Sequence, residues 1–234
     1  AQAELDDLDQ AIDGLCLFYD WRGRCQQGET FCQTALEQLH PQVTGEQRFI
    51  IARLLAWCGF FSQVLDHLEQ ATTRLHASLA LLDELAQAPQ TEDQRDIRAF
   101  ALYALGHATH GTNRSATKQS WEASLALYRA VADEWGVHQV LNNLGRLAVE
   151  VSDYPTAIRL LEESLALGQQ LGDRKSMAHT LCYLGNAYAN LGELAKATEL
   201  SAQSVALSQA LGDRLGAADS MGRMASTLAY RGYL

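Results

Sequence analysis

The chain is 234 residues long, 47% of its residues are hydrophobic, and its formal net charge is −10 at pH 7. This length and composition suffice for a sizeable buried core, whereas the negative charge would repel a phosphate backbone and argues against nucleic acid as a direct partner. No apolar run reaches the roughly 18 residues of a membrane span and no signal peptide opens the chain, so we expect no membrane segment.

The residue types favour helix along the whole chain. There are only 3 prolines, while Ala, Leu, Gln and Glu are abundant, and their side chains lose little freedom on a helix. The 5 cysteines are odd in number, lack CxxC spacing and fall inside apolar helical patterns. Thiols in such positions are typically buried and reduced, so we expect an all-α protein of the cytoplasm.

Repeats begin as a faint pattern and become clear toward the C-terminus. The first copy, around residues 12–19, is only suggestive. LLAWCG (54–59) and LYALG (102–106) then share a Leu-x-x-apolar-Gly core. From about residue 120 the copies match at a constant offset of 40, with SLAL at 124–127 and 164–167 and LGDR at 171–174 and 211–214. Self-similarity at this period is typical of stacked helical repeats.

The clearest copy is predicted to be two helices joined by a turn. Leu181, Leu184, Gly185 and Tyr188 lie at i, i+3, i+4 and i+7, which places them on one face of a helix. A turn over residues 191–193 and a second amphipathic run over 194–211 complete the hairpin.

Hairpins of this kind follow one another along the chain. Gly172 and Asp173, between two copies, form a stop signal and an N-cap for the next helix. We count about five and a half hairpins, roughly at residues 4–40, 44–87, 92–134, 136–171 and 174–211, with a truncated copy at 214–234.

The repeats resemble the tetratricopeptide repeat (TPR). With Leu184 and Gly185 at the seventh and eighth places of the first helix, Leu181, Tyr188 and Ala197 stand where the signature has an apolar residue, Tyr and Ala. The signature's later Pro is absent. The longer period and the LGD connection are similar to repeats of bacterial signal-transduction ATPases with numerous domains (STAND proteins) and of the Leu-Gly-Asn-repeat adaptors. The resemblance implies an all-α fold, a right-handed α-solenoid of stacked hairpins with about 11 helices in one domain.

The resemblance also implies where a ligand would bind, because the first helices of TPR hairpins line a concave groove. Amide side chains can bind an extended peptide backbone, and guanidinium groups can pair with a carboxylate. The alternative is that the polar residues form a solvated helix face and that Trp57 belongs to the core. Carried onto this sequence, the groove residues are Trp57, Tyr103, His107, Asn142, Asn143, Arg146, Tyr183, Asn186, Asn190 and Arg223.

No motif for catalysis, a cofactor or a metal is present. Neither GxxxxGK[ST] nor GxGxxG occurs, so the chain has no phosphate-binding loop of its own. His107 and His110 are three residues apart but have no acidic or Cys partner at a clear spacing. His138 and His179 recur near matching positions without a nucleophile motif. We therefore expect neither enzymatic activity nor a cofactor or metal.

Two functions remain open. In the first, the chain is the sensor domain of a bacterial STAND-type ATPase or transcriptional regulator, whose upstream nucleotide-binding domain stays inactive until the repeats bind a protein, a peptide or a small-molecule inducer. In the second, it is a passive adaptor that docks peptide segments of partner proteins. The absence of an initial Met and the frequency of this repeat type in STAND proteins favour the first modestly.

The last repeat stops after its first helix. AYRGYL (229–234) aligns with ANLGEL (189–194), where a first helix ends and its partner begins. We therefore expect a fragment of a longer repeat protein, in which Met221, Met224 and Leu228 would face a helix that is absent here.

Overall fold

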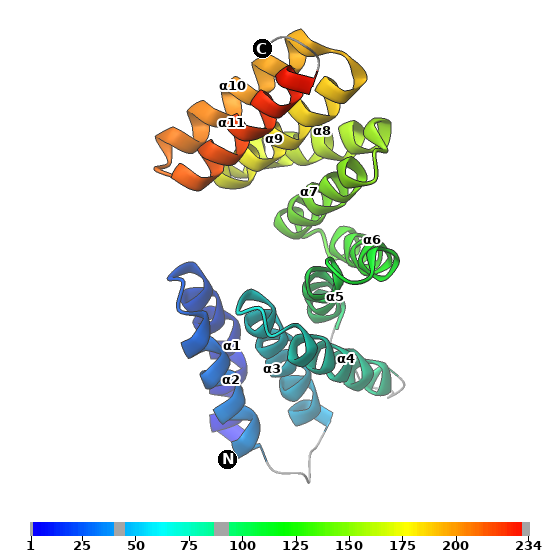
Figure 1. Ribbon diagram of the computed structural model, residues 1–234. Coiled ribbons are helices and arrows are strands. Elements are labelled where there is room, and N and C mark those ends of the chain that lie inside the picture. The colour runs from blue at the N-terminus through cyan, green and yellow to red at the C-terminus, as the bar shows by residue number, and fades with distance from the viewer. Residues whose placement is uncertain (1, 40–44, 87–93, 231–234) are drawn as a thin grey trace. The chain divides into compact units, whose positions relative to one another are not determined.

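Eleven helices make up almost all of the chain that the structure describes (Figure 1). The computed structural model describes residues 2–39, 45–86 and 94–230. Within these ranges no strand occurs, which confirms the predicted all-α class. In chain order the helices are α1 (Gln2–Trp21), α2 (Cys25–Gln38), α3 (Gly45–Val64), α4 (Leu68–Leu85), α5 (Arg95–Thr109), α6 (Arg114–Ala130), α7 (Glu134–Glu150), α8 (Tyr154–Leu171), α9 (Arg174–Leu191), α10 (Leu194–Ala210) and α11 (Arg214–Tyr230).

The helices fall into two compact units, residues 1–131 with α1–α6 and residues 132–234 with α7–α11. In the first unit α1 packs on α2, α3 on α4 and α5 on α6. In the second unit α7 packs on α8, α9 on α10, and α11 lies against both α9 and α10. Successive helices therefore form the predicted hairpins, while the prediction that both units belong to one superhelical domain stays a prediction.

Aspartates set the helix starts in the second unit. Asp133, Asp153, Asp173 and Asp213 each precede a helix, and each carboxylate accepts a hydrogen bond from the backbone N–H three residues later. This bond satisfies an amide that the first turn would leave unpaired. Gly172 ends α8 with a φ of +71°, a left-handed conformation that favours glycine. The predicted stop-and-start signal at residues 172–173 is therefore confirmed.

A glycine on each of four first helices, α3, α5, α7 and α9, lets the following helix approach closely. A Cβ built on Gly185 of α9 would lie 2.6 Å from the Ser201 Oγ of α10. The same close approach occurs in three earlier repeats, at Gly59, Gly106 and Gly145. The predicted reason for a small residue at the eighth place, close contact between paired helices, is confirmed.

A serine repeated in every SLAL or SVAL stretch fastens the second helix of a hairpin to the first. These four serines are buried, and each hydroxyl donates a hydrogen bond to a backbone carbonyl of the preceding helix. Such a bond satisfies a buried hydroxyl and fixes how far one helix can slide along the other. The pairs are Ser78 with Ala52 (2.7 Å), Ser124 with Ala99 (2.7 Å), Ser164 with His138 (3.1 Å) and Ser204 with Ala178 (2.6 Å).

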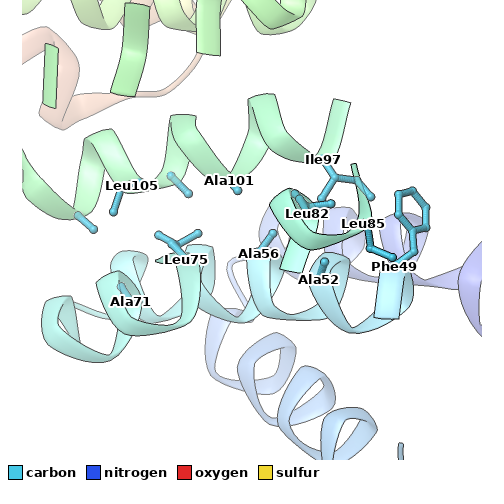
Figure 2. Close-up of a cluster of buried hydrophobic side chains, with 12 residues drawn as sticks. Phe49, Ala52, Ala56, Ala71, Leu75, Leu82, Leu85, Ile97, Ala101 and Leu105 are labelled. Carbon is cyan, nitrogen blue, oxygen red and sulfur yellow. The ribbon is translucent and has the colours of Figure 1, made fainter. Parts of the chain in front are cut away.

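The core of the first unit is formed mainly by small and aliphatic side chains of α3, α4 and α5. Figure 2 shows Leu75 and Leu82 of α4 lying between Ala52 of α3 and Ile97 and Ala101 of α5. Small Ala side chains beside Leu side chains allow the three helices to approach closely and interdigitate.

A second cluster in the same unit holds four of the five cysteines. Cys16, Cys25, Cys32 and Cys58 pack with Ile12 and aromatic side chains of α3. All five cysteines of the chain are buried and unbridged, as predicted. Burial raises the pKa of the Cys58 thiol to about 12, so this thiol stays protonated and unreactive at neutral pH.

One buried carboxylate joins three helices of the first unit. Glu29 of α2 accepts hydrogen bonds from Ser62 of α3 (2.8 Å) and from Arg74 of α4 (2.6 Å). His67, before α4, brings its Nδ1 within 3.8 Å of the other carboxylate oxygen. Nothing in the sequence pattern singled out Glu29, because its partners lie 33 and 45 positions away.

The last helix presents apolar side chains outward. Met221 of α11 is 50% exposed and Leu215 is 85% exposed. The residues that match Met221 in the two preceding repeats, Leu141 and Leu181, are both buried, because α8 and α10 cover them. Met221 is thus exposed, while the prediction that it faces an absent helix stays a prediction, and the side chains of Met224 and Leu228 lie outside the described residues.

Candidate ligand-binding surface

The first helices of the second unit bring together seven of the ten predicted groove residues. Asn143 on α7, Tyr183 on α9 and Arg223 on α11 stand 40 residues apart, at the same place of three successive repeats. Because each repeat presents the same helix face, these three side chains form a row across α7, α9 and α11. We call the row and its neighbours the α7–α9–α11 surface, which comprises Asn142, Asn143, Arg146, Tyr183, Asn186, Asn190 and Arg223.

Tyr183 lies at the centre of this surface between two cationic side chains. The guanidinium carbon of Arg223 is 5.2 Å from the centroid of the Tyr183 ring, within cation–π range. Burial raises the pKa of the Tyr183 hydroxyl, while the positive charges of Arg146 and Arg223 act in the opposite direction. Both guanidinium groups are thus close enough to stabilise the ionised form of the Tyr183 hydroxyl electrostatically.

Each arginine is also paired with a carboxylate one turn away on its own helix. Arg146 lies 3.5 Å from Glu150, and Arg223 lies 2.9 Å from Asp219. These pairs are partly exposed, so each contributes little to stability. They hold the guanidinium groups in place while leaving the pairing open to competition by another anion.

The amide side chains divide into two kinds. Asn190 is exposed and donates to Asn186, to its backbone oxygen at 2.9 Å and its side-chain oxygen at 2.7 Å. Asn142 is only 9% exposed, and its amide donates to Thr180 of α9. Asn143 is also buried, with its amide donating to the Gln139 carbonyl at 2.9 Å. Asn142 therefore fastens α7 to α9, and the amides best placed for a ligand are those of Asn186 and Asn190.

The three remaining predicted residues lie in the first unit. Trp57 is 6% exposed, its indole N–H donates to Asp13 at 2.7 Å, and its ring lies 4.4 Å from that of Phe100. Trp57 is thus a core residue, which was the alternative to its role in the groove. Tyr103 and His107 are half-buried, with ring centroids 4.7 Å apart.

The histidines at the C-terminal end of α5 pack against an aromatic side chain. In the described residues no group of three His, Cys, Asp or Glu side chains could hold a metal ion. His107 and His110 instead place their rings against the buried Trp121, at centroid distances of 5.2 and 5.8 Å. Among the helices described, none has the length and apolar character to cross a membrane.

Comparisons by sequence and by structure give different results. No protein-family model and no curated protein sequence matches the chain. The crystal structure of BtubC (BKLC) from P. vanneervenii, in contrast, superposes with a TM-score of 0.71 at 17% identity, over 91% of this chain and 84% of that one. A STAND protein with a tetratricopeptide repeat sensor from Pyrococcus horikoshii superposes with a TM-score of 0.68 at 16% identity, over 94% of this chain and 32% of that one. This chain has the tetratricopeptide-repeat fold.

Aspartyl phosphate phosphatase F from Bacillus subtilis also superposes on this chain, with a TM-score of 0.68 at 14% identity, over 77% of this chain and 46% of that one. At these identities the likeness shows the fold alone. The chain spans about a third of the STAND protein and under half of the phosphatase.

Proposed function

We propose that the α7–α9–α11 surface binds an extended segment of a protein or peptide. The observation that carries the proposal is that three successive first helices, α7, α9 and α11, present the partly exposed side chains of Arg146, Tyr183 and Arg223 on one surface. Stacked repeats offer a long, regular surface of this kind, and regular spacing suits a ligand that is itself extended. The TPR fold supports a binding role, since it supplies such surfaces without a catalytic centre.

The side chains indicate what the bound segment would contain. Asn186 and Asn190 present amides that can pair with a peptide backbone. Arg146 and Arg223 would pair with a carboxylate in competition with Glu150 and Asp219, and Tyr183 would contact an apolar side chain between them. A ligand with an acidic group near an apolar residue therefore fits best.

At the level of the whole protein, we propose that the chain is the sensor of a STAND-type signal-transduction ATPase or regulator. The likeness to a STAND protein with a TPR sensor supports this choice. Binding of an inducer would then release an upstream nucleotide-binding domain. A passive adaptor is the second candidate, and a Walker A motif in the gene upstream of Ala1 would separate the two.

We expect the double variant Arg146→Ala/Asn186→Ala to bind a peptide ligand about 10- to 100-fold more weakly. The change removes one charge-assisted and one neutral hydrogen bond, together worth roughly 1.5–3 kcal/mol. A peptide selected from a random library on the purified chain serves as the probe, and its dissociation constant is measured by fluorescence anisotropy.

The matched control is Glu199→Ala/Gln203→Ala, which removes an exposed hydrogen-bonded pair of α10 away from this surface. The control should bind the probe like the parent, and both variants should melt within a degree or two of it. Equal affinity of the parent and the Arg146→Ala/Asn186→Ala variant would contradict the proposal that the α7–α9–α11 surface binds the ligand.

A further inference from the structure

His138 is a fully buried histidine at a place where the other repeats have alanine. Its carbonyl accepts the Ser164 hydroxyl bond, as Ala52, Ala99 and Ala178 accept the equivalent serine bonds. The ring fits because the facing residue of α8 is Gly168, where a Cβ would lie 2.9 Å from the imidazole Cε1. The histidine and the glycine thus form a complementary pair that the serine contact does not require.

The hydrogen bonds of the ring fix its tautomer. Nδ1 lies 2.8 Å from the Ser164 carbonyl oxygen and 2.9 Å from the Ser164 hydroxyl, and that hydroxyl donates to the His138 carbonyl at 3.1 Å. Because a carbonyl can only accept, we assign the proton to Nδ1. In the neutral ring Nε2 is then bare. It is buried, receives no hydrogen bond from any described residue and lies 3.7 Å from Asp173 Oδ2.

Asp173 already has two functions at this junction. Its Oδ1 accepts the Ser176 amide at 3.1 Å and so caps α9. Its Oδ2 accepts the Gln139 side-chain amide of α7 at 3.0 Å. Gln139 also donates to the Ser176 hydroxyl at 3.0 Å. The carboxylate therefore ties the start of α9 to α7, beside the bare nitrogen of His138.

We propose that His138 and Asp173 form a proton-operated switch between the repeats of α7–α8 and α9–α10. A proton on Nε2 turns that nitrogen into a cationic donor directed at Asp173 Oδ2. Closing the gap from 3.7 Å to an ordinary hydrogen bond of about 2.8 Å draws the carboxylate away from Gln139 and moves the first turn of α9 relative to α7. Because α7 and α9 carry Arg146 and Tyr183, the switch changes the spacing of the surface described above.

The charges around the ring decide the direction of the pH effect. Burial lowers the pKa of His138, and the nearby Asp173 carboxylate opposes this without reversing it. From α8 the ring meets Ser164 and Gly168, which do not titrate, and on α7 the exposed Glu134 stands one turn earlier. The unfolded chain therefore takes up this proton at a higher pH than the folded one. The neutral His138 side chain therefore makes its full contribution to the stability of the fold above the ordinary histidine pKa of about 6.5. This contribution is lost as the pH falls through the lower pKa that His138 has in the folded chain.

An NMR titration of the purified chain from pH 7.5 to 4.5 tests the switch. We expect the Cε1 signal of His138 to titrate at a lower pH than the histidines of the urea-unfolded chain. The Ser176 backbone amide and the Gln139 side-chain amide should shift with the same midpoint. A Ser176 amide that does not follow His138 would overturn the proposal, as would a His138 midpoint equal to that of the unfolded chain.

Two variants make the test specific. His138→Ala/Gly168→Ser copies the Ala178 and Ser208 pair of the next repeat, so it should fold and lose the His138-linked shift of the Ser176 amide. Asp173→Asn keeps an oxygen for the cap but removes the charge, so it should move the His138 midpoint to still lower pH. His179→Ala, at a half-buried histidine elsewhere on α9, should leave both curves unchanged. Persistence of the Ser176 shift in the first variant would assign it to another group.

Discussion

Replacing Glu29 by Ala should lower the free energy of unfolding by about 3 kcal/mol, the largest effect that we expect from a single polar side chain. The carboxylate is buried between α2, α3 and α4, and its removal leaves the Arg74 guanidinium without its carboxylate partner, while the Ser62 hydroxyl keeps the Cys58 carbonyl as an acceptor at 2.7 Å. Breaking a buried pair in this way typically costs about 3–5 kcal/mol. We choose the low end because the Arg74 side chain keeps 20% exposure and can reach water. Urea unfolding followed by circular dichroism measures the change.

A control variant and a double variant distinguish the loss of the ion pair from a general loss of packing. Glu37→Ala removes an exposed carboxylate from the same helix and should change stability by less than about 0.5 kcal/mol. Glu29→Leu/Arg74→Met, which replaces both charges by apolar groups, should recover most of the loss. If the double variant is no more stable than Glu29→Ala, the cost does not come from the uncompensated charge of Arg74.

Acid should act on the parent and the Glu29→Ala variant differently. Burial alone would raise the pKa of Glu29, but the hydrogen bonds from Ser62 and Arg74 and the charges of Arg74 and His67 together lower it. The carboxylate thus stabilises the fold above its ordinary pKa of 4.5, and this contribution is lost as the pH falls through the lower folded value. The difference in stability between the parent and the variant should therefore shrink below about pH 4.5.

The helices were predictable from the sequence because their signals are local. The offset of 40 located the hairpins, and Gly172 with Asp173 marked a boundary that the φ of +71° and the cap hydrogen bond confirm. Gly185 was assigned correctly to a close helix contact for the same reason. The repeated serine of SLAL was visible too, but its hydrogen bond to the preceding helix could be recognised only from the structure.

The candidate site was less predictable because it depends on partners far along the chain. Asn142 is buried and its amide donates to Thr180 of the next repeat, 38 positions away, whereas Asn186 stays near the surface. Trp57 is buried against Phe61 and Phe100, and Asp13, 44 positions away, accepts its indole N–H. In the N-terminal repeats the weaker pattern gave no sign of that partner.

A second large loss of stability is expected at Gly106 of α5, where two helices are in close contact. A Cβ at this position would lie 2.2 Å from the indole Nε1 of Trp121 and 2.4 Å from its Cδ1. The indole cannot move aside easily, because it is fully buried and its N–H donates to the Tyr103 carbonyl at 3.1 Å. Gly106→Ala should therefore destabilise the chain by about 1–3 kcal/mol, although alanine is the better helix former.

Of three glycine-to-alanine variants, Gly222→Ala should be the most stable and Gly106→Ala the least stable. Gly222→Ala meets no atom within 4 Å and should gain up to about 1 kcal/mol from helix propensity. Gly185→Ala should lie between the other two, because the nearest atom is a serine hydroxyl that can rotate, whereas the Ala197 carbonyl at 3.2 Å cannot. Thermal melting of the three variants measures the order. A Gly106→Ala variant as stable as Gly222→Ala would mean that α5 and α6 do not pack through Trp121, because a rigid buried ring cannot accept a new carbon atom at that distance.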